Sequence, residues 1–169
     1  MKIIAINDAN ILIDLMKIDL IDEFFRLDFE FITTNFIIAE FEMEEQQNLI
    51  NELIRKKKLH IYNLSFDELT DIQSIKFRSS KKLSFEDCSV WYLAKKKNAI
   101  LLTGDNLLRK KAINDGVSVN GILFVIDYLI ENEIITKQLA FEKLKKLLSL
   151  NARLPKNECE IRLNTWKMH

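Results

Sequence analysis

The sequence has few of the residues that make tight turns or crosslinks. Its 169 residues include 3 glycines, 1 proline and 2 cysteines. So few glycines and prolines leave no flexible linker and few hairpin turns, so helices are expected to form most connections. Cys88 and Cys159 lie far apart and outside a Cys-x-x-Cys spacing, which argues against a disulfide framework and against a zinc site.

The chain also lacks an excess charge and a long apolar run. Lys plus Arg and Asp plus Glu each number 25, so no net field attracts nucleic acid or a membrane from a distance. No apolar run reaches the roughly 18 residues of a membrane helix, and the first one, broken by Asn7 and Asp8, is too short for a secretory signal. We therefore expect a cytoplasmic protein in a reducing setting, with no membrane partner.

Short apolar runs alternate with segments of helical periodicity, and the chain is 48% hydrophobic. The alternation predicts an α/β fold: a central parallel sheet of about five strands, flanked by helices on both faces. We expect a single domain over residues 1–169, with a core at about 1–120 and a C-terminal helical extension at about 121–169. The expected strands are 2–7, 29–33, 59–64, 99–103 and 117–119.

Several helix starts can be placed from their caps. Ser65 precedes Glu68 by three residues and Ser84 precedes Asp87 by three, the spacing of a capping box. Further helices are expected after Gly121, at 136–150 and after Pro155.

Four acids, Asp8, Glu40, Asp87 and Asp105, lie at the carboxyl end of an expected strand or early in the helix that follows. In open parallel sheets the carboxyl ends of the strands border the ligand-binding crevice, so these acids can converge there. Each acid alone also has a structural explanation. Asp8 and Asp105 can cap a helix, and Asp87 fits the capping box of Ser84.

Glu40 is expected about one and a half turns into the helix that follows "FITTN", near Glu42, Glu44 and Glu45. A run of charges usually marks a solvated helix face. Glu40 shares its helical stripe with apolar residues, however, so it should border the apolar side of that helix.

A metal explains why four carboxylates should gather. They would repel one another and raise one another's pKa, and a divalent cation neutralises that repulsion. Oxygen-only ligands favour Mg²⁺ or Mn²⁺ over zinc, and neither His60 nor His169 has a ligand spacing.

Three segments, "INDANILIDL", "TTNFIIAEF" and "LSFEDCSVWYLAKKKNAILLTGDNLLRKKA", resemble in order and spacing the acidic motifs of PIN-domain ribonucleases. The tail "VNGILFVIDYLIENEIITKQLAFEKLKKLLSLNARLP" resembles that of many prokaryotic members. The resemblance covers about residues 3–155. It implies that the chain is an Mg²⁺- or Mn²⁺-dependent endoribonuclease, with the toxin half of a toxin–antitoxin pair as its expected role. The partners implied are RNA, an antitoxin protein and a second copy in a homodimer.

The family motifs align Asp8, Glu40, Asp87 and Asp105 with its catalytic metal ligands. One departure concerns the second metal: some members carry a further acid shortly after the "TGD" turn, where this chain has Asn106, Leu107 and Leu108.

Four residues are expected to contact the substrate. Thr103 matches the family's hydroxyl position before the last acid, and Asn10 lies just after Asp8. Arg109 and Lys110 follow Asp105 within about a turn and supply local positive charge for phosphates. The aromatic residues Phe36, Trp91 and Tyr92 lie in patterns typical of a core, so none is assigned to base recognition.

Two other functions stay open at this point. The first is a non-catalytic PIN scaffold that binds RNA or a protein partner and keeps its acids only as helix caps. The second is a different enzyme with an acid at a strand end, such as a phosphatase or a receiver-like fold that is phosphorylated on an aspartate. Such proteins usually have a second acid near the first, where this chain has Asn7 and Asn10.

Overall fold

The protein is described by a computed structural model in which residues 1–167 are placed, so His169 lies outside the described residues. Its five strands form one parallel sheet in the order β3-β2-β1-β4-β5. The strands are β1 (Ile3–Asn7), β2 (Phe29–Thr34), β3 (His60–Tyr62), β4 (Ile100–Leu102) and β5 (Val119–Asn120). The first four lie where the apolar runs predicted them, whereas β5 shares only Val119 with the predicted strand 117–119. The α/β prediction is confirmed.

The strand order contains one reversal of direction. From β1 the chain adds β2 and then β3 on one side, and then crosses over to add β4 and β5 on the other. The carboxyl ends of β1 and β4 therefore lie side by side at the point where the connections diverge, which is where open parallel sheets bind ligands.

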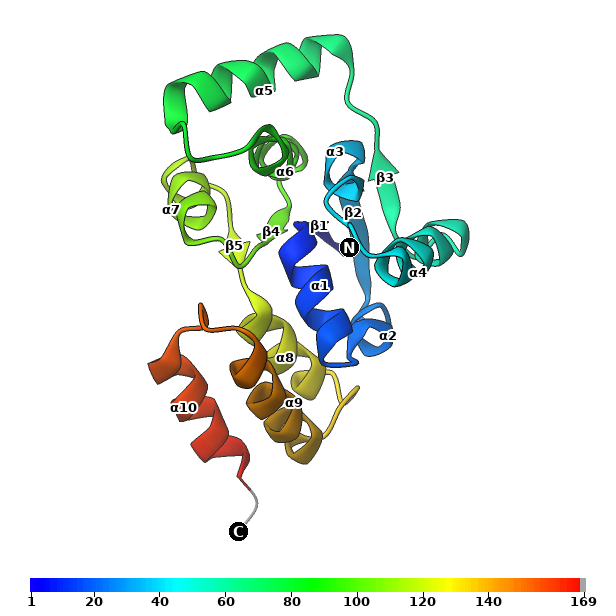
Figure 1. The fold of residues 1–169 in the computed structure, drawn as a ribbon, viewed down its shortest axis with the longest axis vertical. Helices are drawn as coiled ribbons and strands as arrows, with labels where there is room; N and C mark the ends of the chain where they lie inside the picture. Colours follow the sequence, from blue (N-terminus) through cyan, green and yellow to red (C-terminus); the bar gives the residue numbers. More distant parts are fainter. Residues whose placement is uncertain (168–169) are drawn as a thin grey trace.

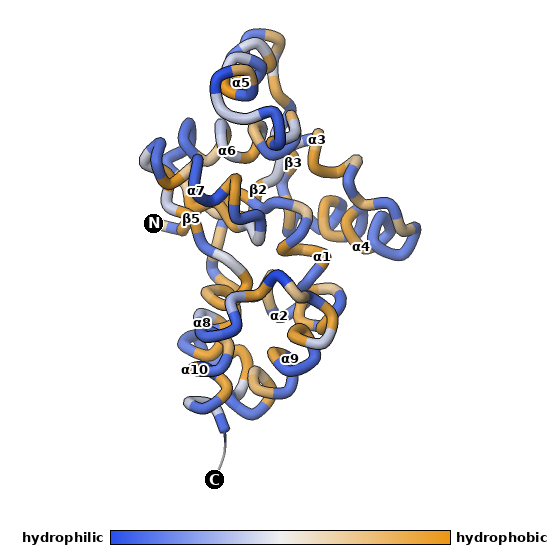
Figure 2. Tube along the Cα trace, turned by 60° about the vertical axis from the view of Figure 1, so that its left-hand side comes forward, coloured by the Kyte–Doolittle hydropathy of each residue, from blue (hydrophilic) through white to orange (hydrophobic). Residues whose placement is uncertain are grey.

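Helices connect the strands and cover the sheet (Figure 1). Between the strands lie α1 (Ala9–Lys17), α2 (Ile21–Phe24), α3 (Asn35–Ile38), α4 (Glu44–Arg55), α5 (Phe66–Ser79), α6 (Phe85–Lys97) and α7 (Asn106–Asn114). After β5 follow α8 (Ile122–Glu131), α9 (Lys137–Leu150) and α10 (Lys156–Trp166). Figure 2 shows α5 at the opposite end of the molecule from α9 and α10.

Both predicted capping boxes are present. The Ser65 hydroxyl accepts from the Glu68 backbone N–H, and the Glu68 carboxylate accepts from the backbone of Ser65. Ser84 and Asp87 form the same pair at the start of α6. These bonds satisfy backbone N–H groups that have no partner inside the helix, so they fix where α5 and α6 begin.

The helix expected to carry Glu40 ends too early. Helix α3 ends at Ile38, and Glu40 lies in the turn that follows, where its N–H donates to the Ile37 carbonyl at 3.0 Å. The prediction that Glu40 lies on a helical stripe bordering the apolar side was therefore wrong. Phe41, three residues after the end of α3, is buried in the core, and the Gln47 side chain donates to its carbonyl at 2.7 Å. The next helix, α4, begins at Glu44.

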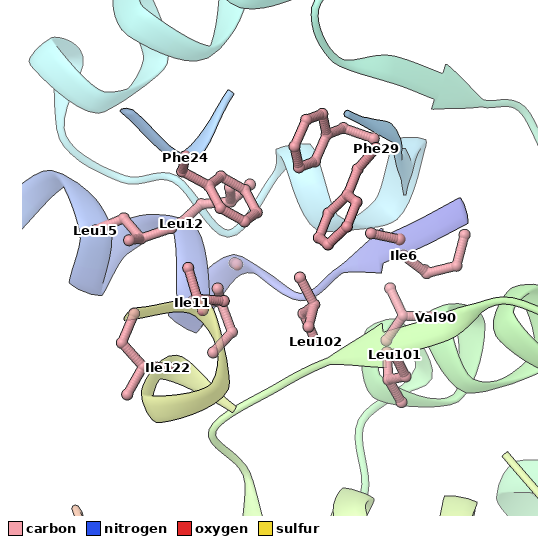
Figure 3. Packing of buried hydrophobic residues seen from close by; sticks show 14 of the residues in the cluster. Ile6, Ile11, Leu12, Leu15, Phe24, Phe29, Val90, Leu101, Leu102 and Ile122 are labelled. Carbon is pink, nitrogen blue, oxygen red and sulfur yellow. The ribbon is translucent and has the colours of Figure 1, made fainter. Parts of the chain in front are cut away.

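The core extends from both sides of the sheet into the C-terminal helices. Val90 of α6 packs with the sheet residues Ile6 and Leu101, and Ile11 of α1 lies beside Ile122 of α8 (Figure 3). The buried cluster continues into α9 and α10 through Ala140, Leu144, Leu147, Cys159 and Trp166. The proposed division at residue 120 stays a prediction, although the apolar packing crosses it.

Two of the three aromatic residues assigned to the core are only partly buried. Trp91 is buried and its indole N–H donates to Asp115, whereas Phe36 and Tyr92 are half-buried. Phe36 packs its ring against Phe85 at 4.9 Å between centroids, near the start of α6. Within residues 1–167 no helix is long and apolar enough to cross a membrane.

Candidate active site

Two of the predicted acids lie where β1 and β4 end side by side. Asp8 follows β1 directly, and its backbone N–H donates to the carbonyl of Leu102, the last residue of β4, at 3.0 Å. Asp105 lies three residues after Leu102 and caps α7. The strand order therefore brings together two acids that are far apart in the sequence.

The Asp8 carboxylate is buried and held by three donors. The residue is only 3% exposed. Its Oδ1 accepts from the Ala9 backbone N–H at 2.9 Å, which caps α1, and its Oδ2 accepts from the Thr103 hydroxyl at 2.7 Å and the Asn10 amide at 3.0 Å. Asp8 therefore caps α1, which was one of its two predicted roles. It also accepts a hydrogen bond from Thr103, the residue that follows β4.

Burial is the main reason why the pKa of Asp8 is raised to about 6. The hydrogen bonds from Thr103 and Ala9 lower that pKa, whereas the nearby charges of Asp87 and Asp105 raise it. Helix capping alone needs no such neighbours. The repulsion indicates that three carboxylates from separate segments face a common region.

Asp87 and Asp105 each cap a helix with one oxygen. Asp87 Oδ2 accepts from the Ser84 N–H at 2.8 Å, and Asp105 Oδ1 accepts from the Leu108 N–H at 2.7 Å. Among residues 1–167, the other oxygen of each carboxylate accepts no hydrogen bond. Burial also raises the pKa of Asp87, against the lowering effect of its bonds to Ser84. A cap and a ligand can therefore share one carboxylate.

Glu40 completes the acidic group from the turn after α3. Its pKa is raised to about 7, first by partial desolvation and then by the charges of Asp8, Asp87 and Glu86. The residue is exposed, so water screens part of this repulsion. Glu86 was not singled out from the sequence, although it directly precedes Asp87 and its charge raises the pKa of both Asp87 and Glu40.

Of the expected substrate contacts, Asn10 and Thr103 bind other parts of the site. The Asn10 amide donates to Asp8, and its oxygen accepts from the Gly104 N–H at 2.9 Å. The Thr103 hydroxyl donates to Asp8 and accepts from the Asp105 N–H at 3.1 Å. Both residues therefore position Asp8 against the "TGD" turn, and their contact with substrate stays a prediction.

The two cations differ in their surroundings. Arg109 is half-buried and lines a hollow that also contains Asn10 and Asp105, whereas Lys110 is exposed and lies outside that hollow. Arg109 is thus the better placed of the two to meet a substrate phosphate.

Replacing Asn10 by alanine is expected to lower the free energy of unfolding by about 1–2 kcal/mol, because its hydrogen bonds to the Asp8 carboxylate and from the Gly104 N–H are lost. Urea denaturation monitored by circular dichroism measures the change. Asn51→Ala, at an exposed position in α4, is the control and should shift the midpoint little. Equal stability of Asn10→Ala and the wild type would contradict the positioning role of Asn10.

The donor set is suited to a hard divalent cation. All four predicted ligands are carboxylates, two of them have an oxygen without a hydrogen-bond partner in the described chain, and burial and mutual repulsion raise the pKa of Asp8, Glu40 and Asp87. In the part of the chain that the structure describes, no three of these side chains already lie at ligating distance of one point. The residues thus match a cation in chemistry, and a bound ion would have to draw them closer.

The fold and the site define an α/β protein with carboxylates grouped at the switch point of a parallel sheet. A family model described as "DUF3368: PIN domain" matches residues 4–168. The chain therefore belongs to the PIN domain family, and the resemblance noted from its acidic motifs is confirmed.

Solved structures share the fold at low sequence identity. The chain is similar to PAE2754 from Pyrobaculum aerophilum, with a TM-score of 0.54, 16% identity, and coverage of 78% of this chain and 99% of that one. It is also similar to SSO1118, a PilT N-terminus domain protein from Sulfolobus solfataricus P2, with a TM-score of 0.50, 14% identity, and coverage of 76% and 95%. No curated protein sequence matches the chain.

Proposed function

We propose that the protein is an endoribonuclease that hydrolyses RNA phosphodiester bonds with Mg²⁺ or Mn²⁺ held by Asp8, Glu40, Asp87 and Asp105. PIN domains are generally nucleases and generally use divalent metals. The observation that carries the proposal is the grouping of the acids at the ends of β1 and β4: Thr103 hydrogen-bonds to both Asp8 and the Asp105 N–H, and, in addition to burial, the charges of Asp87 and Asp105 raise the pKa of Asp8. Caps that served only their own helices would have no reason to converge.

A bound divalent cation would supply Lewis-acid chemistry and an activated water at the phosphodiester. The chain's own residues would prepare that site. Thr103 and Asn10 hold Asp8 in one orientation, and the backbone caps fix Asp87 and Asp105 with one oxygen of each left free. Glu40 would hold the cation from the turn after α3, and the cation's positive charge would offset the repulsion from Asp8 and Asp87 that adds to desolvation in raising its pKa in the metal-free protein.

Cleavage of a single-stranded RNA tests this proposal. The purified protein should cut a labelled RNA in the presence of Mn²⁺ or Mg²⁺, and EDTA should abolish the cutting because carboxylates alone activate water poorly. Zn²⁺ should substitute weakly, since the site has no histidine or cysteine ligand. Cleavage that continues unchanged in EDTA would contradict metal dependence, and no cleavage under any of these conditions would contradict the nuclease activity.

A non-catalytic scaffold is the second candidate. It is favoured by the caps, because Asp8, Asp87 and Asp105 each bind a backbone N–H and so have a structural role without any metal. A scaffold would show RNA or protein binding without metal-dependent cleavage, and its melting temperature would not rise with Mn²⁺.

We further propose that the nuclease acts in the cytoplasm as the toxin of a toxin–antitoxin pair, with an antitoxin protein and a second copy of the chain as partners. The resemblance of the acidic motifs and the C-terminal segment to prokaryotic PIN-domain ribonucleases supports the role. Exposed apolar side chains on α5, Phe66 and Phe77, offer one surface for a partner. Expression of the wild type should arrest growth and expression of Asp87→Asn should not. Equal growth of both strains would contradict the toxin role.

A further inference from the structure

A hollow of about 760 Å³ opens beside Asp105, one of the four acids. At one end it is lined by Asn10, Gly104 and Asp105, which belong to the candidate active site. At the other end it is lined by Arg153 and Pro155, from the segment that connects α9 to α10. In Figure 1 this connection lies near the start of α8, below β5 and α7. The C-terminal helices therefore build one wall of a space that reaches Asp105.

Two guanidinium groups in this hollow have no carboxylate partner among the described residues. Arg162 is occupied, since it binds Asp127 through two nitrogens at 2.7–3.1 Å and also binds Glu158. Arg109 and Arg153, by contrast, form no salt bridge within residues 1–167. Unpaired arginines in a concave site are suited to a phosphate group.

Arg109 is held close to the acidic group by the shape of the chain at Gly121. A Cβ at position 121 would lie 2.8 Å from the Arg109 Nη2 atom and 3.6 Å from the Thr103 carbonyl oxygen. The Arg109 guanidinium therefore occupies the space that a side chain at position 121 would fill, close to Thr103, which directly follows β4. Its positive charge is thereby placed beside the turn that presents Asp105.

The remaining wall is apolar and includes one partly exposed aromatic ring. Phe124 of α8 lines the hollow, is half-buried, and has its ring 5.4 Å from that of Tyr128 in a stacked arrangement. Ile11, Ile122 and Leu150 line the hollow nearby. An aromatic face beside arginines matches a nucleotide, because the base can stack on the ring while the phosphate binds a guanidinium.

We propose that this hollow binds the RNA nucleotide that neighbours the scissile phosphate. Arg109 binds its phosphate, Phe124 stacks on its base, and Arg153 contributes a second positive charge from the C-terminal segment. The proposal rests on the proposed function, since it identifies the scissile position with the acidic group. It assigns the C-terminal helices a direct part in substrate binding, and it favours single-stranded RNA because a paired base cannot stack on Phe124.

Binding of a fluorescein-labelled single-stranded RNA homopolymer, measured by anisotropy in EDTA so that no cleavage occurs, tests the phosphate contact. Arg109→Ala should weaken binding, and it should reduce the slope of log K against log salt by about 0.7, the value for one phosphate contact on a single strand. Gly121→Ala should weaken binding as well, because its methyl group displaces the guanidinium without removing a charge. Arg26→Ala removes an exposed arginine at the amino edge of the sheet and is the control expected to bind as the wild type does.

A pair of variants at position 124 tests the stacking contact. Phe124→Leu keeps an apolar side chain but removes the ring, so RNA binding should weaken about tenfold, whereas Phe124→Tyr should bind like the wild type. Binding to the corresponding RNA duplex should be weaker than to the single strand and equal for both variants. Thermal melts of each variant establish that the native fold is kept.

The outcomes separate this proposal from the proposed function. Wild-type affinity and salt slope in Arg109→Ala, or wild-type affinity in Phe124→Leu, would overturn the nucleotide site even if the protein cleaves RNA. Failure of the wild type to bind the single strand would overturn it too. If the variants weaken binding as expected and the wild type still fails to cleave with Mn²⁺, the site stands as an RNA-binding site and the nuclease function falls.

Discussion

The Asp8→Asn protein is expected to lose RNA cleavage by more than about a hundredfold while keeping its fold. Loss of a group that merely supports a metal ligand costs about 10- to 100-fold, and Asp8 is proposed as a ligand itself. Asparagine can still cap α1 by accepting from the Ala9 N–H, so the backbone need not change. Initial rates of cleavage with saturating Mn²⁺, and circular dichroism of the same samples, measure the two effects.

Asp22→Asn provides a matched control, since it makes the same chemical change at an exposed position in the first turn of α2. It should cleave RNA at the wild-type rate. Robust cleavage by Asp8→Asn, prepared free of contaminating nuclease, would contradict the catalytic assignment of the acidic group.

The second large effect is a dependence of stability on pH in the absence of metal. The pKa of Asp8 is about 6 in the folded protein against an ordinary value of 3.8, so the folded state binds the proton more tightly than the unfolded state. Asp8 therefore stabilises the folded state less as the pH rises from about 4 through about 6. The full difference is on the order of 3 kcal/mol, which follows from about 1.36 kcal/mol for each pKa unit.

Urea denaturation in EDTA at pH 4.5 and pH 7.5 measures this effect against Asp8→Asn, because asparagine does not titrate. At pH 7.5 the variant is relieved of the buried charge but loses the bond from Asn10 or Thr103, so it should be about as stable as the wild type. At pH 4.5 Asp8 is protonated in the folded wild type, so the variant gains nothing from removing its charge. The variant still lacks the hydrogen bond, and it should therefore be less stable than the wild type. If the free energies of unfolding of wild type and variant differed by the same amount at both pH values, the inference that folding raises the pKa of Asp8 would be wrong.

Much of the fold follows from local sequence signals. The apolar runs located the first four strands and lay next to the fifth, and the Ser-x-x-acid spacing located the starts of α5 and α6. Such signals act over a few residues, through strand burial and helix capping, so a single sequence can carry them. Glu40 shows where they fail: the helix before it ends at Ile38 and Phe41 is buried in the core, and no local pattern predicts either.

The candidate site could be predicted only in part, for a related reason. The four acids could be named because Asp8 and Asp105 follow strands and all four match the family's acidic motifs. Their double role could not be predicted: Asp8, Asp87 and Asp105 were weighed as caps or as ligands, and the structure shows that each caps a helix while Asp87 and Asp105 keep one oxygen free. Phe124 and Arg153 carried no signal. They belong to segments that approach the acids only through the packing of α8 and the connection after α9.

Calorimetric titration of the protein with Mn²⁺ tests the central claim, that the acids at the switch point form a divalent cation site. Wild-type protein should bind Mn²⁺ with measurable heat and gain melting temperature in the same concentration range, because binding to the folded state stabilises it. Asp8→Asn and Asp87→Asn should show little of either, and Asp22→Asn should behave like the wild type. No heat and no rise in the melting temperature of the wild type would contradict the metal site and leave the acids as helix caps.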